Sequence, residues 1–172
     1  AYQLPRPVSY IGSVFAGALG TFCVNWLFLG FITILFTYWQ AGGFPFHPLG
    51  LGVAALLGLA AGIISILFRI IIGLSAFWLQ SVDPFFWIWE KLIFMLGGLM
   101  LPLAVYPQWI QTIARFTPFP AILGERSALV FHFNGESILS LTATLVMWGV
   151  IGWVILFFLY RRGLRILNVE GG

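Results

Sequence analysis

Residues 101–120 read LPLAVYPQWIQTIARFTPFP, and four prolines in this stretch surround one short amphipathic segment. Between Pro107 and Pro118, apolar residues recur at helical spacing, and polar residues occupy the opposite side. Because prolines remove backbone donors and break helices, backbone within a bilayer here needs partners from surrounding protein or from a water-filled cavity. The pattern predicts an amphipathic helix suited to a membrane surface, as part of a lined passage or gate.

The composition is that of a membrane protein. Hydrophobic residues make up 61% of the 172 residues, charged residues 8%, and the mean hydropathy is +1.04. Soluble domains contain about 25% charged residues. No Asp, Glu, Lys or Arg occurs between Pro7 and Phe68, and a water-exposed surface could not be built from such a stretch. The composition therefore predicts an all-α, polytopic membrane helix bundle that contacts lipids.

Turn-rich and charged stretches divide the chain into about four predicted spans, each long enough to cross a bilayer. The spans cover residues 12–39, 49–80, 85–106 and 138–160, and an external capping segment covers residues 102–136. Residues 70–82 either extend the second helix or lie in the interface. Trp87 and Trp89 are expected to anchor the start of the third span at the interface. The chain begins at Ala1 without a signal-peptide pattern, so we expect that N-terminal sequence is missing.

Basic residues predict the orientation. The strongest cluster, Arg161, Arg162 and Arg165, follows the last span, and a cytoplasmic position for it places the C-terminus inside and the capping segment outside. Six basic residues are then cytoplasmic, and only Arg115 and Arg126 are external. The net charge of +3 is therefore attributed to orientation and headgroup contact, not to nucleic-acid binding.

Small residues recur every four positions along one face of each of the first two spans. The two sets are Gly12, Ala16 and Gly20 in the first span and Gly50, Ala54, Gly58 and Gly62 in the second. Such faces let helix backbones approach closely. They predict either tight packing within one subunit or a seam between subunits.

Groups that could perform catalysis are scarce. The chain contains no HExxH, GxSxG, P-loop or dinucleotide fingerprint, and its single aspartate, Asp83, is typical of a helix cap. Cys23 is the only cysteine and suits packing, which excludes an intrachain disulfide. His47 and His132 lie outside the spans, where they are structural, solvated, or ligands of a haem or pigment. We predict no catalytic, metal or cofactor-binding residue in this chain.

Three polar residues are predicted within the membrane: Asn25, Glu90 and Lys91. Glu90 and Lys91 are adjacent on a helix and cannot pair with each other. Either one of them faces a polar cavity, or Lys91 reaches the headgroups and Glu90 meets a partner such as Arg69. Asn25 needs a partner on a neighbouring helix or a polar substrate.

Several stretches together resemble a known family. They are RPVSY near the start, GLMLPLAVYPQW, TPFPAILGE, a last span containing a tryptophan, and the ending YRRGLRILNVEGG. In this order they resemble the membrane (permease) subunit of a type-two ATP-binding-cassette exporter. The resemblance covers essentially all of this chain and the C-terminal two-thirds of a usual permease. It implies a six-span permease whose first two spans are not in this sequence.

The resemblance also implies partners and roles. A separate ATPase would bind ATP and Mg, a second permease, identical or homologous, would complete the path, and the complex would lie in the inner or plasma membrane of a bacterium. The loop that docks on the ATPase in this family corresponds here to Pro5, Arg6 and Pro7. The external gate residues implied by the resemblance are Pro102, Pro107, Trp109, Pro118, Phe119, Pro120 and Glu125.

One departure from the family concerns the gate. A proline is expected soon after PFPAILG, whereas this chain has Glu125, Arg126 and Ser127. Glu125 and Arg126 either hold the external loop closed or are solvated. Aromatic residues make up 18% of the chain and suit an amphiphilic or lipid-like substrate better than an ion. The alternatives are a non-catalytic structural subunit of a larger membrane complex and a lipid-modifying enzyme, for which no catalytic constellation is present.

Overall fold

The computed structural model describes residues 10–131 and 133–170, and every element in these ranges is a helix. The all-α, polytopic helical bundle predicted from the composition is therefore confirmed. The chain forms two compact units, one ending at Phe46 and the other beginning at His47. The expected docking residues Pro5, Arg6 and Pro7 and the histidine His132 lie outside the described residues.

The first unit contains α1 (Tyr10–Ala41), a helix of 32 residues without any charged side chain. Its apolar residues are distributed around the whole helix, as expected of a membrane span. The helix ends at Ala41, and the next residue, Gly42, has a φ of +67°, a left-handed conformation that only glycine adopts readily. The turn predicted in this glycine-rich and proline-rich stretch is therefore present.

The second unit begins with α2 (Pro48–Leu74), which a short 3-10 helix, η1 (Ser75–Phe77), extends. Pro48 occupies the first helical turn, where its missing N–H costs nothing. His47 is the N-cap, and its Nδ1 accepts a hydrogen bond of 3.3 Å from the backbone N–H of Gly50. Within residues 70–82, the helical conformation continues as far as Phe77.

The third predicted span is shorter than expected. Its helix, α3 (Asp83–Leu96), has 14 residues and spans about 21 Å, less than the roughly 30 Å of a hydrocarbon core. The helix stops at the pair Gly97 and Gly98, and Gly98 has a φ of +80°. Asp83 lies in the first turn of α3, although no side-chain capping bond is made at this N-terminus.

The remaining helices of the described residues are four short ones and one long one. They are η2 (Leu103–Val105), α4 (Gln108–Arg115), α5 (Phe119–Ile122), α6 (Glu125–Phe131) and α7 (Gly135–Glu170). Helix α4 confirms the short amphipathic helix predicted between Pro107 and Pro118. Among the described residues, three helical stretches are long and apolar enough to cross a membrane: Ile11–Ala41, Pro48–Phe77 and Gly135–Gly163.

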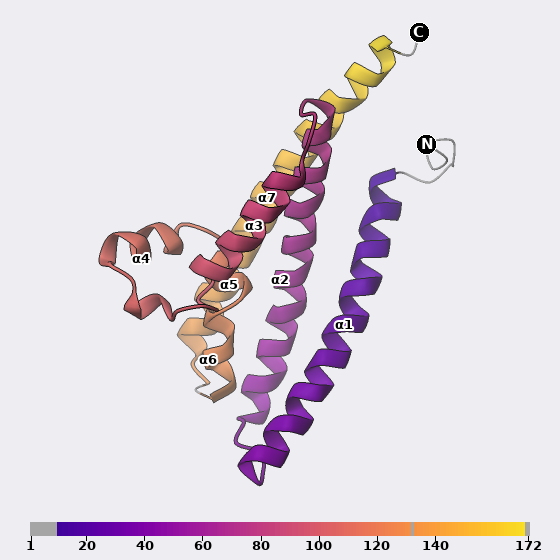
Figure 1. The fold of residues 1–172 in the computed structure, drawn as a ribbon. Coiled ribbons are helices and arrows are strands. Elements are labelled where there is room, and N and C mark those ends of the chain that lie inside the picture. Colours follow the sequence, from indigo (N-terminus) through magenta and orange to yellow (C-terminus); the bar gives the residue numbers. More distant parts are fainter. Residues whose placement is uncertain (1–9, 132, 171–172) are drawn as a thin grey trace. The chain divides into compact units, whose positions relative to one another are not determined.

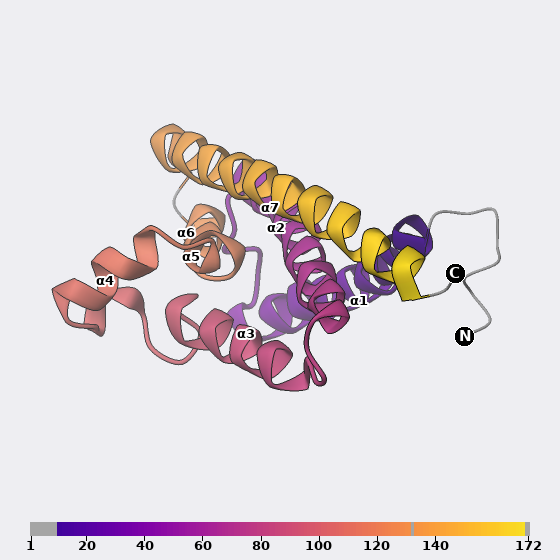
Figure 2. The same ribbon diagram turned by 90° about the horizontal axis from the view of Figure 1, so that it is seen from above.

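Helix α2 is the centre of the second unit. It packs along α7 and also contacts α5 and α6, as Figure 1 shows. The small and branched residues of α2 form a core with residues of α6 and α7: Ala54, Leu57, Ala61, Ile64, Leu129, Leu141 and Leu145. In the view of Figure 2, α4 stands away from α2 and α7, beyond α5 and α6.

Candidate functional site

The capping segment leaves α3 and returns to it. A Cβ atom added to Gly97 would overlap the backbone of α3 and lie 3.2 Å from the carbonyl oxygen of Phe119, and one added to Gly124 would overlap the carbonyl oxygen of Gly97. Only glycines permit such close backbone contact. The chain from Gly98 to Leu123 is therefore an excursion that begins and ends at one point, and it is not a continuation of α3.

The return of the chain buries α5 completely. All four of its residues, Phe119, Pro120, Ala121 and Ile122, are buried, and the preceding Pro118 is buried too. Helix α5 contacts both α2 and α3, whose side chains cover it. Of the expected gate residues, Pro118, Phe119 and Pro120 are thus gathered in the protein interior. The other four, Pro102, Pro107, Trp109 and Glu125, are exposed.

Helix α6 is fixed to the start of α2. The backbone N–H of His47 donates a hydrogen bond of 3.1 Å to the carbonyl oxygen of Val130. A Cβ atom on Gly50 would overlap the carbonyl oxygen of Leu129, so the small residue at this position permits direct backbone contact. The imidazole of His47 stacks on Phe133 at a centroid distance of 5.2 Å. Of the roles considered for His47, these contacts support the structural one.

Helix α4 directs its apolar stripe away from the bundle. Trp109, Ile113 and Phe116 follow one another at helical spacing and are 65%, 52% and 77% exposed. Gln111 does not lie on an outer polar face, because its side-chain amide donates to the backbone carbonyl of Tyr106 at 2.8 Å. That bond satisfies a carbonyl in the proline-flanked turn that precedes α4, as such backbone requires. The stripe remains available for contact with lipid or protein.

An ion pair connects α2 to α3. A guanidinium nitrogen of Arg69 donates to Glu90 Oε1, and both side chains are half-exposed. Of the two alternatives considered for Glu90, the structure shows the pairing with Arg69. The ammonium of Lys91 points elsewhere and lies 5.3 Å from the ring centroid of Trp87, a cation–π distance. Asn25 is exposed on α1 and has no hydrogen-bond partner among the residues that the structure describes.

Trp89 is a core residue and not an interfacial anchor. Its side chain is only 9% exposed, whereas Trp87 is 62% exposed. The Trp89 ring stacks on Phe68 of α2 at 4.9 Å and meets Phe119 of α5 edge-on at 5.1 Å. The expectation that both tryptophans anchor the span at the interface is wrong for Trp89, because neighbouring helices supply three-dimensional contacts that the local sequence does not reveal.

Phe68 extends this ring cluster to α7. Its ring lies 6.2 Å from that of Trp148, at an interplanar angle of 58°. The indole nitrogens of Trp89 and Trp148 are both buried, and neither has a hydrogen-bond partner in the described part of the chain. The only signal for this cluster in the sequence was the abundance of aromatic residues, which could not tell these rings from the lipid-facing ones.

Glu125 and Arg126 differ in environment. Glu125 is exposed, Arg126 is half-buried, and neither forms an ion pair within the described ranges. Burial lowers the pKa of the Arg126 guanidinium from its ordinary value. No ion pair that would hold the capping segment closed is therefore seen between these residues and a described neighbour.

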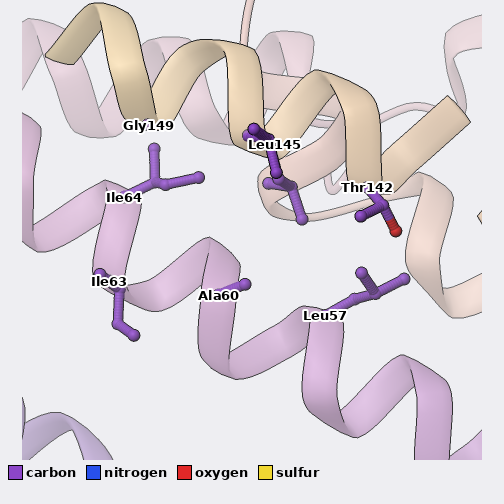
Figure 3. A pocket seen from close by; sticks show the side chains of 8 residues that line it. Leu57, Ala60, Ile63, Ile64, Thr142, Leu145 and Gly149 are labelled. Atoms are coloured by element: carbon purple, nitrogen blue, oxygen red, sulfur yellow. The ribbon is translucent and has the colours of Figure 1, made fainter. Parts of the chain in front are cut away.

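An apolar groove lies between α2 and α7 (Figure 3), with a volume of about 240 Å³. It is lined by Leu57, Ala60, Ile63, Ile64, Thr142, Leu145, Val146 and Gly149. Thr142 contributes no free hydroxyl, since its Oγ1 donates to the carbonyl oxygen of Ile138 at 2.7 Å. The groove offers only hydrocarbon contact. Among the described residues, no group of three or more His, Cys, Asp or Glu side chains could hold a metal.

Comparison with known proteins identifies the family. The family model of the ABC-2 family transporter protein matches residues 2–171, nearly the whole chain. No match was found among curated proteins or among solved structures. The family consists of the membrane subunits of ATP-binding-cassette transporters, which associate with an ATPase. With its long apolar helices, this integral membrane chain is a transport subunit and belongs to the ABC-2 transporter family.

Proposed function

We propose that this chain is one of two permease subunits that together form the export path for an amphiphilic or lipid-like substrate. Separate ATPase subunits bind ATP and Mg and drive the cycle, and this chain holds no nucleotide of its own. The path opens alternately to the two sides of the membrane as the helices rearrange. Export, pairing and substrate class all go beyond family membership.

The observation that carries the proposal is the closed excursion of the chain between Gly97 and Gly124. It stops α3 before that helix is long enough to cross a bilayer and returns the buried helix α5 against α2 and α3. Non-helical backbone at membrane depth is tolerated where protein covers it or where it lines a cavity. A segment built in this way suits a gate at the end of a transport path.

The apolar surroundings of the excursion and of the groove support the choice of substrate class. Rings and aliphatic side chains surround the excursion, and the groove between α2 and α7 is lined without a free polar group. Such surfaces supply contact area without fixed charge, which suits an amphiphile better than an ion. The residues Pro5, Arg6 and Pro7 remain the proposed contact with the ATPase, on the cytoplasmic side with the C-terminus.

The experiment is co-expression of this chain with a candidate ATP-binding-cassette ATPase chosen from the reading frames that neighbour its gene, followed by purification and reconstitution into liposomes. We expect copurification, ATP hydrolysis that vanadate inhibits, and ATP-dependent movement of a fluorescent phospholipid analogue out of the compartment that contains the ATPase. Copurification without ATP-dependent movement of any amphiphile would contradict the substrate class. A stable complex that lacks an ATPase would instead indicate a structural subunit.

A further inference from the structure

Two consecutive residues of α2 meet two consecutive residues of α3. Phe68 stacks on Trp89 at a centroid distance of 4.9 Å and an interplanar angle of 20°, and the next residues, Arg69 and Glu90, form the ion pair. Arg69 and Glu90 are the only ion pair found in the described residues. The ring pair and the ion pair therefore fix α3 on α2 at one level.

The same tryptophan reaches the capping segment. Its ring meets that of Phe119 at 5.1 Å and 61°, and Phe119 is only 6% exposed. Phe119 is the first residue of α5, all of which is buried. Because a close-packed interior has few voids, a shift of the Trp89 ring displaces its neighbours. Trp89 thus lies between the ion pair and the excursion of the chain.

Ring contacts, and not a hydrogen bond, determine where Trp89 lies. The indole Nε1 of Trp89 is buried and has no acceptor among the described residues. A buried donor without an acceptor destabilises the fold, whereas an aromatic pair contributes favourably beyond the area that it buries. The two ring contacts, to Phe68 and to Phe119, hold the side chain in place despite the unsatisfied N–H.

We propose that Trp89 is a positioning residue that transmits the relative placement of α2 and α3, set by the ion pair of Arg69 and Glu90, to α5. When the ion pair opens, α3 can move relative to α2. The movement shifts the Trp89 ring, which in turn displaces Phe119 and the capping segment. The route is a contiguous set of contacts. Its consequence for transport rests on the proposed function, but the link itself can be tested without ATPase or substrate.

The test measures the capping segment directly. In the full chain, Cys23→Ser removes the only cysteine, and Glu125→Cys places a reporter at the exposed start of α6. The chain is purified into lipid nanodiscs, and the rate of thiol modification by a water-soluble maleimide is recorded. Glu90→Gln is expected to change this rate at least about fivefold, the lower end of typical coupling between sites. The matched control Lys91→Gln, one residue away, is expected to leave it unchanged.

The link is then cut at Trp89. With Trp89→Leu, the two ring contacts are lost, and adding Glu90→Gln is expected to change the rate by less than about twofold, the limit of additivity between independent sites. With Trp89→Phe, a ring remains at both contacts and the unsatisfied N–H is gone, so the full effect of Glu90→Gln is expected to return. Phe119→Leu removes the contact from the other side and should act like Trp89→Leu.

Four results for the labelling rate would overturn the proposal. The first is an equal change with Glu90→Gln and with Lys91→Gln, and the second is no change with Glu90→Gln. The third is an undiminished effect of Glu90→Gln in both the Trp89→Leu and the Phe119→Leu backgrounds, and the fourth is failure of Trp89→Phe to restore that effect. A purely structural role predicts additive effects and therefore the third outcome. If the ATPase does not copurify, the proposed function fails while the labelling result stands, so the two failures are distinguishable.

Discussion

Helices α1 and α2 carry the same four-residue repeat of small residues, but the structure uses the two faces differently. In α2 the repeat, Gly50, Ala54, Gly58 and Gly62, is buried throughout. In α1 the repeat, Gly12, Ala16 and Gly20, is exposed, and no atom lies within 4 Å of a Cβ built on Gly20. The four-residue repeat therefore predicts that another segment can come close to the helix backbone, but it does not identify that segment.

The kind of neighbouring atom decides which of these positions require glycine. Lipid tails are as apolar as the side chains, so helices in a bilayer associate through packing and hydrogen bonds. At Gly50 the neighbour is a backbone carbonyl, that of Leu129, which cannot move without disturbing α6. The seam within one subunit that the sequence allowed is confirmed for α2. For α1, both packing within the subunit and a seam between subunits remain predictions.

The largest loss of stability is expected at the backbone contact between α2 and α6. Gly50→Ala places a methyl group against the carbonyl oxygen of Leu129, and overpacking of this kind costs typically about 1–3 kcal/mol. The measurement is unfolding in mixed micelles at increasing dodecyl sulfate, followed by circular dichroism. An unchanged transition would mean that α6 is not held against the start of α2.

A smaller loss of stability is expected where the atom next to the glycine belongs to a side chain that can move. A Cβ on Gly152 of α7 would lie 2.7 Å from Cδ2 of Leu67, the end of a flexible side chain. Gly152→Ala should therefore cost less than Gly50→Ala, below about 1 kcal/mol, the lower end for inserted methyl groups. The same dodecyl sulfate titration compares the two variants. A reversal of their order would contradict the distinction between backbone and side-chain neighbours.

Asn25 lies on the side of α1 opposite the small-residue repeat, at 3.6 residues per helical turn, and tests whether another subunit packs on that side. Interhelical hydrogen bonds in membranes contribute on average about 0.6 kcal/mol, so Asn25→Leu should weaken association with the second permease by roughly that amount. The unfolding of the isolated chain should not change, because Asn25 has no partner among the described residues. Dimerisation in nanodiscs, measured by energy transfer between labelled chains, distinguishes the two effects. A destabilised monomer would place the partner within the chain.

The smallest effect is expected at the open glycine of α1. Gly20→Ala adds a methyl group where no atom lies within 4 Å, and alanine is the better helix former, so no loss of stability is expected. Unfolding in mixed micelles beside Gly50→Ala gives the direct contrast. A loss as large as that of Gly50→Ala would show that the face of α1 is packed within the subunit after all.

Several features of the fold and site were predictable because their causes are local. The helix between Pro107 and Pro118 follows from proline placement and apolar spacing, and the pairing of Glu90 with Arg69 follows from the cost of unpaired charge near a bilayer. The end of α3 at Leu96 was missed, although Gly97 and Gly98 mark it. Two glycines in an apolar run are common in membrane helices, so the sequence could not show that these stop one.

Membrane insertion, the course of the long helices and their interruption by prolines could be read from the sequence, because hydropathy, helical period and proline chemistry act over a few neighbouring residues. The ABC-2 family was recognised from the resemblance of several stretches of sequence and is shown by the family model. Only the tertiary structure decided that Gly124 returns to Gly97 and that Trp89 lies between Phe68 and Phe119. Contacts between residues far apart in the chain depend on how complete helices pack, and no local pattern encodes which surfaces meet.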